Sequence, residues 1–154
     1  MKKWMSIVAV VLTGLIAGLM LGTGMDQYAN QQLSGSAWTT EHQAVDSLFR
    51  RVMPTVFNGT VVVLLLATWA ARGTGRWLFG LAAVLMIVAV VMTVRVEVPI
   101  NREVAQWSAA APPKDWADVR DTWLSYDLMR TVAVVAAFMC TAVGLTKIRA
   151  VPRY

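Results

Sequence analysis

One histidine and a nearby aspartate are the first side chains in this sequence that could move a proton. His42 is the only histidine in the chain, and histidine exchanges protons near neutral pH without help from its surroundings. Asp46 follows four residues later, so both side chains lie on one face if this segment is helical. The aspartate is then placed to orient the imidazole or to share a proton with it.

A second concentration of polar residues lies at 95–130, between two long apolar runs. It holds six of the nine acidic residues and three of the seven tryptophans. If the apolar runs pack as an up-down-up-down bundle, this stretch and His42 meet at the same rim. Four polar residues would then reach the histidine from the other side of the bundle: Glu97, Asn101, Asp127 and Arg130.

We therefore predict a proton-transfer site. Its catalytic residues are His42, Asp46, Asp127 and Arg130, with Arg130 or Arg95 holding an oxyanion. The predicted substrate-binding residues are Arg95, Glu97, Asn101, Trp116, Arg120 and Trp123. The same charges also fit a lattice of salt bridges that only fixes the loops over the bundle, and the sequence leaves both interpretations open.

The inventory of metal ligands is short. A non-haem iron site usually needs two histidines and a carboxylate, and a di-iron bundle needs Glu-x-x-His pairs. This chain has one histidine and no such pair, and its single cysteine, Cys140, lies within an apolar run. We expect no metal and no other cofactor, although haem with His42 as one axial ligand stays an alternative without a motif.

Long apolar runs must position these side chains. The chain is 57% hydrophobic and only 15% charged, against about 25% charged for a soluble domain. Runs of this length predict membrane-spanning helices. We predict one all-α domain over 1–154, a four-helix transmembrane bundle with spans at about 4–22, 55–71, 77–97 and 128–146. The basic residues flank the apolar runs and form no stripe, which argues against nucleic-acid binding.

The segments between the spans carry helix signals of their own. The composition of residues 23–40 predicts a loop. A short amphipathic helix is expected to follow from Glu41, with Thr39 or Thr40 as its N-cap. Pro54 is expected to open the second span. Pro99 is expected to end or kink the third, because proline lacks the backbone donor. A polar helix then starts after Pro112-Pro113 with Asp115 as its N-cap. Trp116, Arg120, Trp123, Asp127 and Arg130 form one stripe along it.

The distribution of charge predicts the topology. The two ends of the chain and the turn around 72–76 hold seven basic residues and no acid, whereas the other connections hold all nine acids. By the positive-inside rule both termini are cytoplasmic in an integral cell-membrane protein. The basic start and first apolar run also fit a signal peptide, but no small-residue cleavage site follows, so we expect a retained helix.

A glycine stripe on the first helix has two interpretations. Gly14, Gly18 and Gly22 recur every four residues, a spacing that lets another backbone approach closely in a membrane. The partner is either a neighbouring helix of the same chain or a second copy, which would make the protein a homo-oligomer.

Four segments together resemble a known family. They are EHQAVDSLFRRVMP, VPINREVAQW, APPKDWADVRDTW and YDLMRT, at 41–54, 98–107, 111–123 and 126–131. Their order and spacing resemble the DUF1772, or anthrone-oxygenase-like, family of small four-helix membrane proteins. The resemblance implies oxidation of an anthrone-type, polycyclic or phenolic apolar substrate by dioxygen without metal or flavin. His42 would then act as the base and Arg130 would stabilise the enolate. The alternative is a non-catalytic membrane subunit whose polar outer cap docks a partner protein or lipid.

Overall fold

Helices make up almost all of this protein. The computed structural model describes residues 2–147. Four long helices, α1 (Lys2–Ala29), α2 (Gly35–Ala70), α3 (Thr74–Met92) and α5 (Trp116–Thr146), are joined by shorter helical pieces. These are a 3₁₀ turn, η1 (Asn30–Gln32), a π-helical turn, η2 (Thr93–Glu97), and α4 (Val98–Val104). The predicted all-α four-helix bundle is confirmed.

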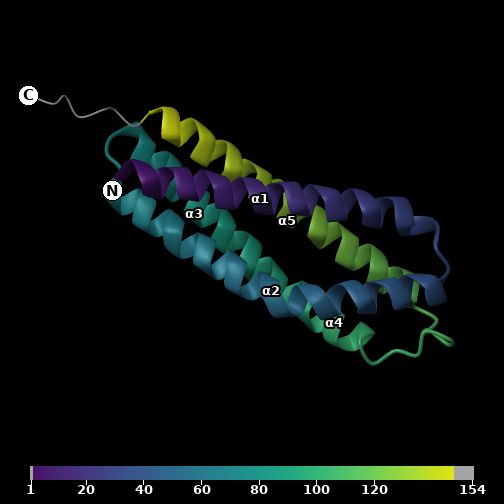
Figure 1. Cartoon of the computed structure of the whole chain (residues 1–154). Coiled ribbons are helices and arrows are strands. Elements are labelled where there is room, and N and C mark those ends of the chain that lie inside the picture. The colour runs from purple at the N-terminus through teal and green to yellow at the C-terminus, as the bar shows by residue number, and fades with distance from the viewer. Residues whose placement is uncertain (1, 148–154) are drawn as a thin grey trace, which may run out of the picture.

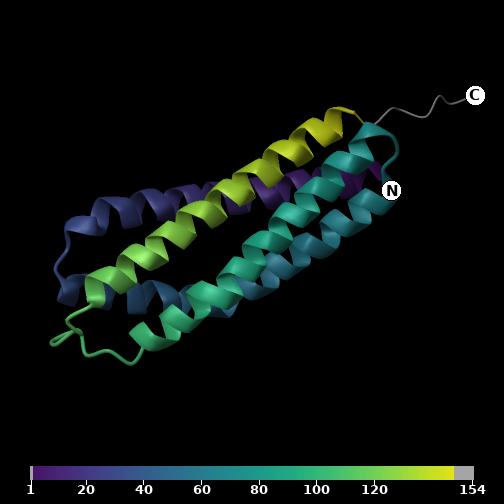
Figure 2. The same ribbon diagram turned by 180° about the vertical axis from the view of Figure 1, so that it is seen from behind.

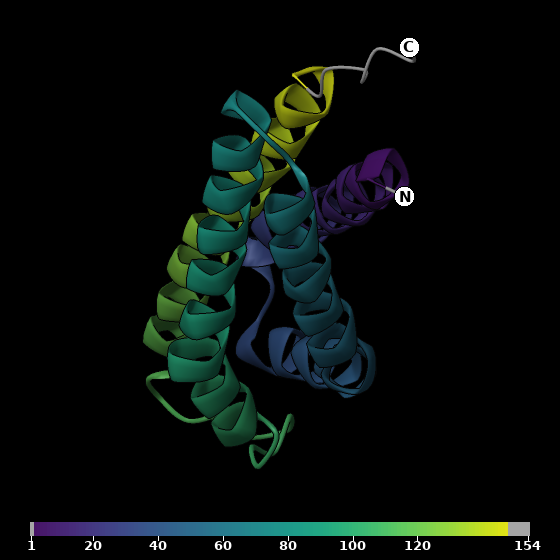
Figure 3. The ribbon, with the colours of Figure 1, turned by 90° about the vertical axis from the view of Figure 1, so that its left-hand side faces the viewer.

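The long helices run up-down-up-down, so each packs against its neighbours in a ring. Contacts join α1 to α2, α2 to α3, α3 to α5 and α5 to α1. Figure 2 shows α5 lying between α1 and α3. The start of α1 and the end of α5 lie at one end of the bundle, and the connections around 30–34 and 105–115 lie at the other (Figure 1). Figure 3 looks onto the bundle from the side where α1 begins and α5 ends.

The helices are suited to a bilayer. Four of them are long and apolar enough to cross a membrane, and they cover Lys3–Gln32, Gly35–Ala70, Thr74–Val104 and Trp116–Thr146. Each exceeds the roughly 20 residues that a span needs. The chain is thus built as a multi-pass membrane protein, and its longer helices extend beyond the apolar layer.

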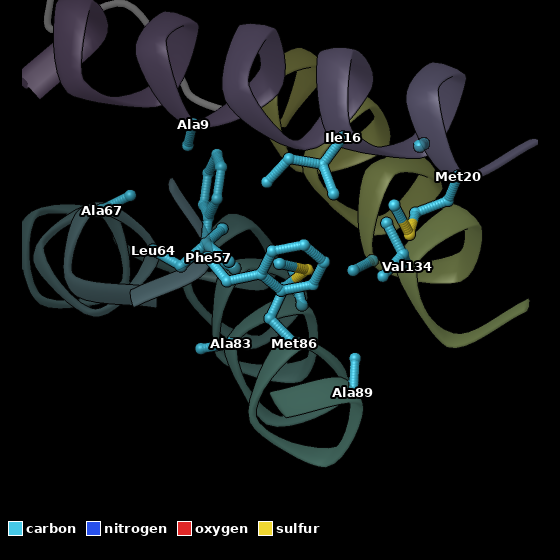
Figure 4. Close-up of a cluster of buried hydrophobic side chains, with 14 of the residues drawn as sticks. Ala9, Ile16, Met20, Phe57, Leu64, Ala67, Ala83, Met86, Ala89 and Val134 are labelled. Atoms are coloured by element: carbon cyan, nitrogen blue, oxygen red, sulfur yellow. The ribbon is translucent and has the colours of Figure 1, made fainter. Parts of the chain in front are cut away.

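The core combines a few large side chains with many alanines. Phe57, Leu64 and Phe79 are buried, and alanines on all four long helices fill the space between them. Figure 4 shows Phe57 and Met86 among side chains from α1 and α5. Small residues let membrane helices approach closely, which supplies the packing that drives their association.

The glycine stripe of α1 divides between two environments. A Cβ at Gly14 would come within 3.0 Å of the Phe138 ring on α5, whereas nothing lies within 4 Å of such an atom at Gly18 or Gly22. Gly14 therefore packs within the chain. Gly18 and Gly22 face outward and contact no other helix of the chain. A homo-oligomer formed through them stays a prediction.

The expectation of a loop over 23–40 is wrong. Helix α1 continues to Ala29, η1 follows, and α2 begins at Gly35. Ser34, rather than Thr39 or Thr40, is the N-cap, and its hydroxyl accepts a hydrogen bond from the Ala37 amide. Low helix propensity is a weak preference that tertiary packing overrides. Here Gln27 and Trp38 are buried within this segment.

Two prolines lie inside helical backbone where the sequence predicted boundaries. Pro54 lies within α2, so the amphipathic segment and the second span form one helix. Helix α2 changes direction between its two halves (Figure 1), as expected where proline removes a backbone hydrogen bond. Pro99 lies in the first turn of α4, directly after the π-helical turn. The wider turn accommodates the missing donor, and the helical path continues to Val104.

The remaining connections match the sequence more closely. The turn between α2 and α3 is tight, and Gly73 adopts φ of 60°, a conformation that glycine allows. Asp115 is the residue before α5, as predicted, but its side chain makes no capping hydrogen bond.

Candidate functional site

A cavity of about 370 Å³ lies between the four long helices, toward the end that carries the connections around 30–34 and 105–115. The surface of its wall is mostly apolar, with polar residues from α1, α2, η2, α4 and α5, whereas α3 contributes Val90. Seven of the ten predicted site residues line it: His42, Asp46, Glu97, Asn101, Trp123, Asp127 and Arg130. Helices distant in sequence thus bring these residues to one place.

Asn101 joins the histidine to the rest of the site. The Trp123 indole donates to Asn101 Oδ1 at 2.8 Å, and Asn101 Nδ2 donates to Asp46 Oδ1 at 2.8 Å. An indole N–H can only donate, so the orientation of the amide is fixed. His42 Nε2 lies 3.1 Å from the same Oδ1 and must therefore carry a proton and donate it. In the neutral imidazole the free, basic nitrogen is Nδ1.

Aromatic rings hold the imidazole in place. Trp38 lies beside it with ring centroids 4.7 Å apart and planes tilted by 31°. Trp123 meets it edge-on at 5.0 Å. His42 is only 4% exposed, so it is held in a mostly apolar niche at the cavity wall. A neutral ring with one nitrogen engaged is the form that a general base needs.

Arg130 lies between two carboxylates. One terminal nitrogen binds Glu97 and also donates to the Thr93 hydroxyl at 3.1 Å, and the other binds Asp127. Glu97 is 1% exposed and Asp127 3% exposed. This buried triad of Glu97, Arg130 and Asp127 holds two acids for one cation, so the guanidinium charge is already balanced within the protein.

Several polar atoms in the cavity wall have no partner in the protein. They are Gln27 Oε1, Glu97 Oε1 and Arg130 Nε. Leaving a buried polar atom unpaired costs about 1–3 kcal/mol. Two acceptors and one donor thus lie buried and unpaired in the side chains that form the wall.

Three predicted site residues do not line the cavity. Arg95 is exposed, because cavity-lining residues on this helical path recur at steps of four through Thr93, Glu97 and Asn101, which leaves position 95 on the outer side. Arg120 donates to the backbone oxygen of Gln31 at 2.8 Å and covers the ring of Trp116.

The helical stripe on α5 therefore has two parts with different contacts. Its first part, Trp116 and Arg120, fastens α5 to η1 and to the start of α2, where the Trp116 ring packs against Gly35. Its second part, Trp123, Asp127 and Arg130, enters the cavity wall. The stripe of aromatic and charged residues on α5 therefore faces other helices in its first part and the cavity in its second part.

Sequence reasoning missed Gln27 and Trp38. Both lie in the segment that was read as a loop. Gln27 continues the spacing of Met20 and Thr23, which also line the cavity, and Trp38 precedes His42 by one helical turn. A helical reading of 23–40 would have placed both at the site.

The described residues offer no metal-binding cluster. Within residues 2–147, no three His, Cys, Asp or Glu side chains come together in a way that could hold a metal ion. The acids near His42 are instead engaged by Asn101 and Arg130.

These features define a small four-helix membrane protein with a mostly apolar cavity, a buried histidine and a buried ion triad in its wall. The family model described as anthrone oxygenase matches residues 42–140, more than half of the chain. The protein belongs to the anthrone oxygenase family. The match spans α2 from His42 onward through most of α5 and includes most of the polar cavity wall. No curated protein and no solved structure matches this chain.

Proposed function

We propose that this protein is a membrane-bound oxygenase that uses dioxygen, without metal or flavin, to oxidise an apolar polycyclic phenol of the anthrone type. One observation carries the proposal: a histidine that uses Nε2 to bind Asn101 lies in the wall of a largely apolar cavity that also contains Arg130. Membership of the anthrone oxygenase family supports it.

The reaction needs a base and a stabilised anion. An anthrone is acidic at the methylene carbon across the ring from its carbonyl, because the resulting anion spreads onto the carbonyl oxygen and the aromatic rings. We assign the base to His42 Nδ1, since Nε2 is occupied by Asn101. The niche formed by Trp38 and Trp123 keeps the ring in one orientation, which is what a positioned base requires.

The oxygen chemistry belongs to the substrate anion. Removal of one proton leaves an electron-rich carbanion that reduces dioxygen, and a carbon–oxygen bond forms to give a hydroperoxide. Loss of water from the carbon that carries this group leaves a carbonyl. The methylene compound and one O₂ thus become the quinone and one H₂O, and no other oxidant or reductant is needed.

The unpartnered polar atoms match a phenolic substrate. Arg130 Nε has a hydrogen to donate and no acceptor in the protein, so we assign it to the substrate oxygen that gains charge. Glu97 Oε1 and Gln27 Oε1 are acceptors without donors, and phenolic hydroxyls would supply the missing hydrogens. Small side-chain rotations would bring these atoms to the cavity surface.

Purified protein in lipid nanodiscs tests the proposal. Oxygen uptake with a hydroxylated anthrone should yield the anthraquinone, and the rate should survive treatment with a metal chelator. His42→Gln should lower the rate about 10²- to 10⁴-fold, the usual contribution of a general base. Glu41→Gln, one residue away and not in the cavity wall, is the matched control. Absence of uptake above the uncatalysed rate, or a rate lost to chelator and restored by iron or copper, refutes the mechanism.

The membrane orientation is part of the proposal. The end of the bundle where α1 begins and α5 ends carries Lys2, Lys3, Arg72, Arg76 and Lys147. None of the acidic residues that the structure describes lies at this end. By the positive-inside rule this end is cytoplasmic in the cell membrane, and the cavity lies toward the outer surface. Further basic residues at 149 and 153 lie outside the described residues.

Cysteine labelling in a Cys140→Ala background tests this orientation. Both Thr74 and Ala110 are exposed, at opposite ends of the bundle. A membrane-impermeant thiol reagent added to intact cells should label Ala110→Cys and spare Thr74→Cys. Labelling with the opposite preference refutes the orientation.

A further inference from the structure

The exposed part of the cavity wall belongs to only two sides of the bundle. Among the described residues that line the cavity, those from α1 and α5 are buried or half-buried. Those classed as exposed are Arg50, Pro54 and Asn58 on α2, Val94 on η2 and Arg102 on α4. The cavity therefore opens sideways, between α2 and the path from η2 to α4.

The depth of this opening follows from helix geometry. Asn58 lies twelve residues before Ala70, the end of α2, which is about 18 Å along the axis. Arg50 on α2 and Val94 on η2 each lie twenty residues from the turn between α2 and α3, or about 30 Å.

The turn itself marks one surface of the membrane. Trp69 and Trp77 on either side of it are 76% and 81% exposed, and exposed tryptophans of this kind anchor helices at the interface. With a hydrocarbon core of about 30 Å, the opening begins inside the apolar layer at Asn58. It ends near the opposite surface, at Arg50.

The surface end of the opening is positively charged. The Arg50 side chain is 62% exposed, and its distance to Asp46 is 3.8 Å, a loose ion pair. Arg102 is exposed, and among the described residues no carboxylate lies within ion-pair distance of it. Two arginines at the membrane surface above a lipid-facing apolar opening fit an amphiphile whose rings enter the lipid while an anionic group stays at the surface.

We propose that the substrate enters the cavity sideways from the lipid layer, through the opening between α2 and η2–α4. Arg50 and Arg102 then select an apolar polycyclic substrate that carries a carboxylate or phenolate. This inference rests on the proposed function for the substrate class, and it adds the route and the charge requirement.

Ligand binding tests the route independently of catalysis. The probes are anthracene-9-carboxylate and neutral 9-anthracenemethanol, titrated into nanodiscs of phosphatidylcholine that hold the protein or no protein. Probe fluorescence anisotropy, corrected for partition into the lipid, gives Kd. Neither probe is oxidised, so probe binding is measured independently of catalysis. If the probes bind as expected but the hydroxylated anthrone is not oxidised, the proposed function fails and the entry route stands.

Variants separate charge selection from entry. Arg50→Gln/Arg102→Gln should weaken carboxylate binding about 3- to 10-fold and leave the neutral probe unchanged. Val94→Trp should slow association of both probes at least 10-fold by narrowing the opening. The matched control is Val91→Trp at the end of α3, which continues directly into η2. Val91 is exposed and outside the cavity wall, so this variant should change the binding of neither probe.

Two results would overturn the proposal. Unchanged carboxylate affinity in the double arginine variant removes the charge selection, and unchanged association in Val94→Trp removes the route. Nanodiscs containing phosphatidylglycerol test whether an anionic lipid headgroup, and not the substrate, binds the two arginines. If that lipid displaces the carboxylate probe from the wild type and not from the arginine variant, the opening is a lipid site.

Discussion

Removal of the Asn101 side chain should uncouple His42 from its surroundings. This one amide takes part in three hydrogen bonds, at 3.1 Å with His42, 2.8 Å with Trp123 and 2.8 Å with Asp46. Asn101→Ala leaves two donors and one charged acceptor without partners. An unsatisfied buried group costs about 1–3 kcal/mol, and water from the cavity can satisfy part of the set, so we expect a loss of about 2–4 kcal/mol.

The stability assay has an internal comparison. Trp123→Phe removes a single donor from the same amide oxygen and should cost about 1 kcal/mol. Unfolding in detergent followed by circular dichroism measures both variants.

Exchange of two side chains tests the geometry more sharply. Asn101→Asp alone sets two carboxylates against each other at the position of the present 2.8 Å hydrogen bond with Asp46. Adding Asp46→Asn to this variant restores the hydrogen bond with its direction reversed, so that residue 46 donates and residue 101 accepts. The double variant should therefore be more stable than Asn101→Asp, with a coupling of about 0.5–3 kcal/mol.

The imidazole itself reports whether the amide positions the base. His42 is the only histidine, so ¹⁵N-histidine labelling gives one pair of ring signals. The wild type should show a slowly exchanging Nε2–H and an unprotonated Nδ1. In Asn101→Ala the N–H signal should broaden by exchange with water, and the oxidation rate should fall at least 10-fold. A wild-type ring protonated at Nδ1 alone would refute the assignment, as would an unchanged rate in Asn101→Ala.

Further predictions concern packing and metals. Gly35→Ala should destabilise the protein by about 1–3 kcal/mol, because its Cβ would lie 2.8 Å from the Trp116 ring. Gly18→Ala, with nothing within 4 Å, should be neutral or stabilising by up to about 1 kcal/mol in thermal unfolding, and loss of a dimer in this variant would assign the glycine stripe to an interface between copies. Dialysis against chelator should leave the thermal midpoint unchanged as well as the rate, and a drop in the midpoint would reveal a structural metal.

The fold was predictable wherever the composition of one segment is enough to determine its secondary structure. Each long apolar run leaves no option but a helix that satisfies its own backbone in lipid, and four such runs make a bundle. Residues 23–40 were not predictable in this way. Their Gly, Ser, Asn and Gln content favours a loop, and it is the burial of Gln27, Trp38 and Thr39 against other helices that makes them helical.

The site was predictable where residues share a helix. The pairing of Asp127 with Arg130 follows from spacing alone, and so does the common face of His42 and Asp46. Asp46, however, binds Asn101 and not the imidazole. The central place of Asn101 depends on the register between α2, α4 and α5, which no local pattern reveals. Arg95 was predicted as a site residue but does not line the cavity. Its spacing of two residues from Glu97 places it on another face of the helix, which local pattern alone could have shown.

The charge balance of the buried triad separates a site from a salt-bridge lattice. Arg130→Met leaves Glu97 and Asp127 without their cation and should cost about 3–5 kcal/mol, so a loss of activity in this variant alone says little about catalysis. Glu97→Gln removes one of the two negative charges and should keep or raise stability.

The neutral triple variant, Glu97→Gln/Asp127→Asn/Arg130→Met, has similar volume and no buried charge. Replacing a buried ion cluster by neutral groups is often tolerated, so its thermal midpoint should return close to that of the wild type. If Arg130 stabilises the substrate anion, this stable variant should still lose at least 10²-fold in oxidation rate, the usual effect of removing such a donor. Wild-type turnover in a folded protein without the arginine would show that the triad is purely structural.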